Sequence, residues 1–127
     1  MRHLESGLQQ ACVGWFNLQY ASYYGLLYSS LNGVYTTSSQ ARSAKAEGMV
    51  PGVADLTLSV ARRGYHGLFI EMKAGSRGRQ SEAQRRWQLK VEEQGYCYVI
   101  CRSFADFKRV IDGYLSETDV KQQTLWQ

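Results

Sequence analysis

The stretch that decides the fold is residues 51–73, which read PGVADLTLSVARRGYHGLFIEMK. Two short runs of alternating apolar residues flank Gly64, and this pattern predicts a β-hairpin. Alternate side chains of a strand point to opposite sides of a sheet, so the apolar positions of each run share one side. The positions predicted to face the core are Leu56, Leu58, Val60, Leu68, Ile70 and Met72.

Three ionisable residues occupy the other side of this hairpin, at its open end. Asp55 opens the first predicted strand, residues 55–60, while Glu71 and Lys73 lie near the end of the second, residues 68–74. Alternation places Glu71 and Lys73 on one side, about 7 Å apart along the strand. A turn at the central glycine pairs Asp55 with residue 73, give or take two positions. We therefore expect the three side chains to converge.

Two carboxylates and a lysine at strand ends suit a hard divalent cation. Mg²⁺ takes oxygen ligands, usually one or two carboxylates together with waters and substrate phosphates. Asp55 and Glu71 supply carboxylates, and the backbone carbonyl of Met72 offers a third oxygen. Lys73 would then orient or deprotonate a water, or stabilise charge on a phosphoryl group. The alternative is an ordinary ion pair between Lys73 and either acid on an exposed sheet face.

The periodicity of the remaining sequence predicts an α/β domain, a small mixed β-sheet flanked by helices. The expected elements are a helix over residues 4–20, a strand over 26–31 closed by a turn at Asn32-Gly33, a short helix over 39–47, the hairpin, a helix opening at Ser81, a strand over 96–101 and a helix capped by Ser103. The predicted core stripe of the first helix is Leu4, Leu8, Ala11, Trp15 and Leu18. We expect one domain over residues 1–127, with 116–127 as a C-terminal tail.

The net charge of +4 is unevenly distributed. Positions 73 to 90 contain six basic residues and only one acidic residue, Glu82. The cluster consists of Lys73, Arg77, Arg79, Arg85, Arg86 and Lys90. It fits a polyanionic partner with phosphates, and the alternative is a solvated helix face with a charged loop. No apolar run approaches the ~20 residues of a membrane helix. The first ten residues also lack the apolar core of a signal peptide, so we expect a cytoplasmic protein without a membrane partner.

The hairpin and its surroundings resemble the PD-(D/E)xK nuclease superfamily and, more narrowly, the VRR-Nuc family. The resemblance rests on an ordered set of residues over roughly 5–104 of this sequence. The set is Glu5, Asn32-Gly33, Lys45, Gly48, Pro51-Gly52, Asp55-Leu56, Gly67 to Phe69, Glu71-Met72-Lys73, Ser81, Gln84 and Gly95-Tyr96. One departure is Ala54, which stands where the family usually has proline directly before the metal-binding aspartate.

The resemblance implies a restriction-endonuclease-like core that cleaves DNA phosphodiesters with Mg²⁺ or Mn²⁺. It implies that Asp55 and Glu71 are metal ligands, that Lys73 is the catalytic lysine and that Glu5 is a further acid near the metal. Gln84 would contact DNA or help to order the site, or simply cap its helix with Ser81. The expected DNA contacts are Lys45, Arg77, Arg79, Gln84, Arg85, Arg86 and Lys90.

Small stand-alone members of this family are similar to Holliday-junction resolvases, which act as homodimers on branched DNA. We therefore expect a structure-selective endonuclease that pairs with a second copy of itself. Two alternatives remain open at this stage. One is a module that binds branched DNA without cutting it, and the other is a restriction-type nuclease that recognises a sequence.

Overall fold

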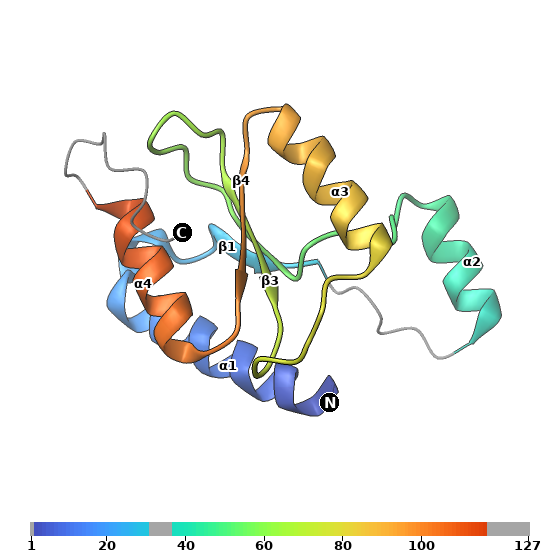
Figure 1. The fold of residues 1–127 in the computed structure, drawn as a ribbon, viewed down its shortest axis with the longest axis horizontal. Coiled ribbons are helices and arrows are strands. Elements are labelled where there is room, and N and C mark those ends of the chain that lie inside the picture. The colour runs from blue at the N-terminus through green and yellow to red at the C-terminus, as the bar shows by residue number, and fades with distance from the viewer. Residues whose placement is uncertain (1, 31–36, 117–127) are drawn as a thin grey trace.

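The computed structural model describes residues 2–30 and 37–116, and it shows a four-stranded mixed sheet with helices on both faces (Figure 1). Its elements in chain order are α1 (Arg2–Gln19), η1 (Ala21–Tyr23), β1 (Leu27–Ser29), α2 (Ser38–Ala46), β2 (Leu56–Leu58), β3 (Leu68–Met72), α3 (Glu82–Glu93), β4 (Cys97–Cys101) and α4 (Phe104–Leu115). This confirms the predicted fold class and element order. The turn expected at Asn32-Gly33 and the tail beyond Ser116 lie outside the described residues. Within those described ranges, no helix is both long and apolar enough to cross a membrane.

The strands follow the order β1-β2-β3-β4, and only the last pair is parallel. The antiparallel pair β2–β3 places Leu56 opposite Ile70 and Leu58 opposite Leu68. Its connection closes at a bridge between residues 62 and 65, with positive φ angles at Arg63 (54°) and Gly64 (85°). Positive φ at both central residues is the geometry of the type I′ turn, which fits the twist of a hairpin. The parallel pair β3–β4 requires a crossover, and α3 provides it.

The core fills the space between one sheet face and the helices α1 and α4 (Figure 1). The six positions that alternation assigned to this face, from Leu56 to Met72, are all buried. Trp15 of α1 packs edge to face against Phe104 and Phe107 of α4, with ring centroids 6.0 and 6.1 Å apart. The hydroxyl of Tyr20 donates a hydrogen bond to Asp112 Oδ1 at 2.5 Å, which joins the ends of the two helices.

The core stripe predicted for the first helix is wrong in part. Leu4 and Leu18 are 54% and 85% exposed, and Ala11 is also exposed, whereas Cys12 and Phe16 are completely buried. The inner face is therefore rotated by about one position from the predicted stripe. The reason is tertiary, because α1 must face both the sheet and α4, and only the Cys12 and Phe16 side meets both.

The opposite sheet face is covered by α3. Phe69 of β3 packs against Trp87 of α3 at a centroid distance of 4.7 Å and against Tyr96 at 5.0 Å. Glu71 is two positions further along β3, so it lies on the same face, near the start of α3. The helix thus brings its first turn, which contains Gln84, over the end of the strand.

Candidate active site

Asp55 is held from both sides at the start of β2. Its backbone carbonyl accepts a hydrogen bond from the Ser30 amide at 3.0 Å, and its Oδ2 accepts one from the Met72 amide at 2.8 Å. Extending the β2–β3 register by one position places Asp55 opposite Glu71. The Met72 side chain points into the core, so only its backbone is available to the site.

Glu71 is the one charged side chain that is buried among the residues whose burial the structure describes, with 3% of its surface exposed. Its Oε2 accepts a hydrogen bond from Gln84 Nε2 at 2.8 Å and lies 3.6 Å from Lys73 Nζ. Its Oε1 is buried and has no hydrogen-bond partner among the described residues. Burial raises the pKa of Glu71 to about 8, with further contributions from the Asp55 charge and from a hydrogen bond with the Asp55 carboxyl, although Lys73 acts in the opposite direction.

These two carboxyl groups fit a divalent cation. An oxygen that is buried without a donor carries a desolvation cost, and a cation between Asp55 and Glu71 would remove it. Within the described part of the chain, no three His, Cys, Asp or Glu side chains gather closely enough to hold a metal. A cation at this place would have Asp55 and Glu71 as its carboxylate ligands, and backbone, water or phosphate oxygens would have to fill its other positions.

Lys73 is fixed beside Glu71 by the loop that follows β3. Its side chain is 13% exposed, and a Cβ placed on Gly78 would lie 3.3 Å from the Lys73 Cβ. The guanidinium of Arg102 donates hydrogen bonds to the carbonyls of Gly75 at 3.2 Å and Gly78 at 2.6 Å, which anchors the loop against the end of β4. Sequence reasoning missed Arg102, because nothing local marks an arginine that binds a loop 24 residues away.

Gln84 both caps its helix and contacts the site, a combination that the sequence allowed. It forms the capping box of α3, since its Oε1 accepts a hydrogen bond from the Ser81 amide at 2.9 Å. Its Nε2 at the same time donates to Glu71. The turn at Gly52 (φ +91°) lies directly against this helix start, where a Cβ would be 2.4 Å from the Ala83 carbonyl oxygen. The absence of a side chain at position 52 therefore allows the first turn of α3, which contains Gln84, to pack closely against the 51–52 turn.

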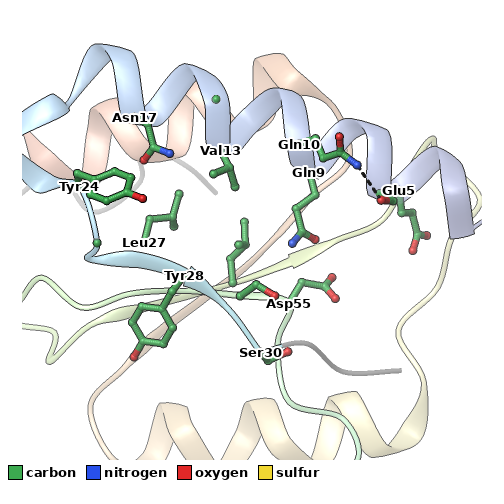
Figure 2. Close-up of a pocket in the computed structure, with 15 residues that line it drawn as sticks. Glu5, Gln9, Gln10, Val13, Asn17, Tyr24, Leu27, Tyr28, Ser30 and Asp55 are labelled. Atoms are coloured by element: carbon green, nitrogen blue, oxygen red, sulfur yellow. Dashed lines mark hydrogen bonds between the residues drawn. The ribbon is translucent and has the colours of Figure 1, made fainter. Parts of the chain in front are cut away.

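Glu5 lies apart from this group, on the first turns of α1. It lines the same groove as Asp55, at the end of the groove where the Asp55 carboxylate lies (Figure 2). Gln9, one turn further along α1, points from the helix toward the strands at this end. Gln9 was also missed from the sequence, where it read only as a neighbour of the core stripe.

The basic residues predicted to contact DNA are all exposed. They are Arg77 and Arg79 in the loop after β3, Arg85, Arg86 and Lys90 on α3, and Lys45 on α2. Arg86 forms an exposed ion pair with Glu82 at 3.2 Å, which costs little to break. The α3 side of the site thus presents several positively charged side chains to solvent, and none of these is buried in the core.

Comparison with known proteins places this arrangement in context. The family model described as the VRR-NUC domain matches residues 3–105. A solved structure described as a VRR_NUC domain protein has a TM-score of 0.77 to this fold at 25% sequence identity, over 87% of this chain and 87% of that chain. No curated protein is similar enough to count as a match. The matched range 3–105 contains the positions of Glu5, Asp55, Glu71, Lys73 and Gln84.

Proposed function

Because this chain belongs to the VRR-NUC domain family, and so carries a nuclease domain of the restriction-endonuclease-like type, we propose that it is a Mg²⁺- or Mn²⁺-dependent endodeoxyribonuclease selective for branched DNA. Four-way junctions or related branches are the proposed substrates. The observation that carries the proposal is the buried Glu71, whose Oε1 has no hydrogen-bond partner within the described chain and which lies beside Asp55 and Lys73.

Each residue of the site has a distinct proposed role. Asp55, Glu71 and the Met72 carbonyl hold the cation, with Glu5 as a further acid at the edge of the site. The cation, when bound, polarises the phosphodiester and lowers the pKa of a bound water. Lys73 brings a positive charge within 3.6 Å of Glu71 and stabilises negative charge that develops on the phosphoryl group. Gln84 holds the Glu71 carboxylate in place through its 2.8 Å hydrogen bond.

DNA binding is assigned to the exposed cations around α3. Phosphate contacts from lysine and arginine supply most of the sequence-independent affinity for DNA. The proposed contacts are Lys45, Arg77, Arg79, Arg85, Arg86 and Lys90, together with Gln84 beside Glu71. Binding that is directed to phosphates agrees with selection by DNA shape rather than by base sequence, so a restriction-type activity ranks lower.

We assign a homodimer as the working form. A four-way junction has two equivalent strands to cut, whereas the fold described here contains one Asp55–Glu71 site. A twofold-symmetric pair would present two such sites to one junction. The mass of the protein in solution, measured by light scattering with and without junction DNA, tests this part: a monomer with full junction activity would overturn it.

The activity is tested with purified protein and three substrates: a four-way junction, a flap and a linear duplex. Each is incubated with Mg²⁺, Mn²⁺ or EDTA, and nicks are counted on denaturing gels. We expect nicks in the branched substrates with either cation and none in EDTA. Binding without nicks under every condition would instead favour a module that recognises branched DNA without cutting it.

A further inference from the structure

A groove of about 740 Å³ runs between α1 and β1 and ends at the active site (Figure 2). Tyr24 and Asn17 lie at one end, and Glu5 and Asp55 lie at the other. The groove exists because β1 is an edge strand and α1 covers the inner strands more closely than it covers β1. A DNA strand bound at Asp55 can therefore extend into this groove on the α1 side.

The chemistry of the groove differs from that of the α3 side. Among the described residues that line it there is no lysine or arginine, and the charged ones are Glu5 and Asp55. The apolar side chains in it are Val13, Leu27 and Leu56, and its amide side chains are Gln9, Gln10 and Asn17. Primary amides donate and accept hydrogen bonds, as the edges of nucleobases do, while apolar and aromatic groups pack against base faces. Such a lining suits bases rather than phosphates.

The groove is large enough for a short run of nucleotides, since pockets for molecules of drug size measure roughly 300–1,000 Å³. The exposed cations that suit duplex phosphates lie on α3 and the loop before it, across the sheet from α1 (Figure 1). Asp55 lies at the boundary between these two surfaces.

From this division we infer that the groove binds unpaired nucleotides next to the scissile phosphodiester. The substrate class is then DNA with a single-stranded segment at the cleavage point, such as a flap, a gap or an opened branch point. Tyr24 stacks on a base, and Asn17 and Gln9 read base edges along the groove. The inference rests on the proposed function, because it assumes that DNA is cut at Asp55.

Two variants test the groove, and one serves as a matched control. Tyr24 is 76% exposed, so Tyr24→Ala removes the stacking group without disturbing the core. Asn17→Ala removes an amide from the same end. Leu18→Ala truncates a side chain that is 85% exposed and outside the groove, and it should change neither fold nor binding.

Binding is measured in EDTA, where the proposed activity is absent, on a duplex with a 2-aminopurine in a short unpaired tail and on the same duplex without a tail. Wild-type protein should quench the unpaired 2-aminopurine, and Tyr24→Ala should abolish the quenching. Tyr24→Ala should also weaken binding of the tailed DNA about fivefold or more, with Asn17→Ala weakening it to a lesser degree. Binding of the untailed duplex should stay unchanged in all three variants.

Equal affinity of wild type and Tyr24→Ala for the tailed DNA would overturn the inference, as would equal losses on tailed and untailed DNA. A wild-type protein that nicks no substrate with Mg²⁺ would contradict the proposed activity instead. In that case the affinities of wild type and Tyr24→Ala for tailed and untailed DNA, measured in EDTA, would still show whether the groove binds unpaired nucleotides. The two failures are therefore distinguishable.

Discussion

Replacing Gly52 with alanine tests whether the turn at 51–52 sets the position of Gln84. The added Cβ would lie 2.4 Å from the Ala83 carbonyl oxygen and 2.9 Å from the Gln84 amide nitrogen. Both neighbours are backbone atoms, so neither can rotate away, and the start of α3 must move. Gly48 is a matched control, because its φ of +111° is also positive while a Cβ there would meet nothing within 4 Å.

The two substitutions share one cost and differ in another. An L-residue in the left-handed region costs about 1–2 kcal/mol, and both variants carry this cost. Forcing extra atoms into a closely packed contact adds about 1–3 kcal/mol, and only Gly52→Ala carries that cost. We therefore expect Gly48→Ala to lower the free energy of unfolding by about 1–2 kcal/mol and Gly52→Ala by about 2–5 kcal/mol.

The assays are urea unfolding and nicking of branched DNA. A displaced α3 start stretches the 2.8 Å hydrogen bond from Gln84 to Glu71. A misplacement of about 1 Å in an active site can cost 100-fold in rate, so Gly52→Ala should nick roughly 10- to 100-fold more slowly. Gly48→Ala should retain nearly full activity. Equal losses of stability and activity in the two variants would refute the proposed contact between the turn and the helix.

Two further predictions concern the same site. In EDTA the free energy of unfolding should fall as the pH rises from about 4.5 to about 8, because folded Glu71 keeps its proton up to about pH 8 while the unfolded chain releases it near 4.5. The total change should be a few kcal/mol in urea titrations, and Glu71→Gln should flatten it; an unchanged slope in that variant would contradict the assignment. Arg102→Met should slow nicking about tenfold by freeing the loop beside Lys73. Arg109→Met, which removes the ion pair between the exposed Arg109 and the half-buried Asp106 but leaves the Arg102 side chain in place, is its control and should leave the rate unchanged.

The hairpin was predictable because strand parity is a local rule. Alternation alone placed Leu56 and Ile70 on the core face and Glu71 on the other. We expected Asp55 to pair with residue 73, give or take two positions. The observed register, extended by one position beyond Leu56 and Ile70, places Asp55 opposite Glu71, which is within that range. The capping of α3 by Ser81 followed from a four-residue pattern in the same way.

The errors and omissions have a tertiary cause. The first helix carries apolar residues on neighbouring stripes, and the choice of Cys12 and Phe16 over Leu4 and Leu18 depends on where α4 packs. The hydrogen bonds from Arg102 to the loop and the closeness of Gly52 to α3 join residues distant in sequence. No periodicity or spacing encodes such contacts. The metal-binding and catalytic roles of Asp55, Glu71, Lys73 and Gln84 stay predictions, as do those of Glu5 and the Met72 carbonyl.

The most direct test of the proposed active site is the nicking of branched DNA by wild type and by Lys73→Ala. We predict that wild-type protein nicks with Mg²⁺ or Mn²⁺ and not in EDTA, and that Lys73→Ala binds the same DNA but leaves no detectable nicks. Circular dichroism confirms that the variant is folded, and it is purified from fresh columns to exclude contaminating nucleases. Metal-dependent nicking that persists in such a Lys73→Ala preparation would contradict the assignment of the site.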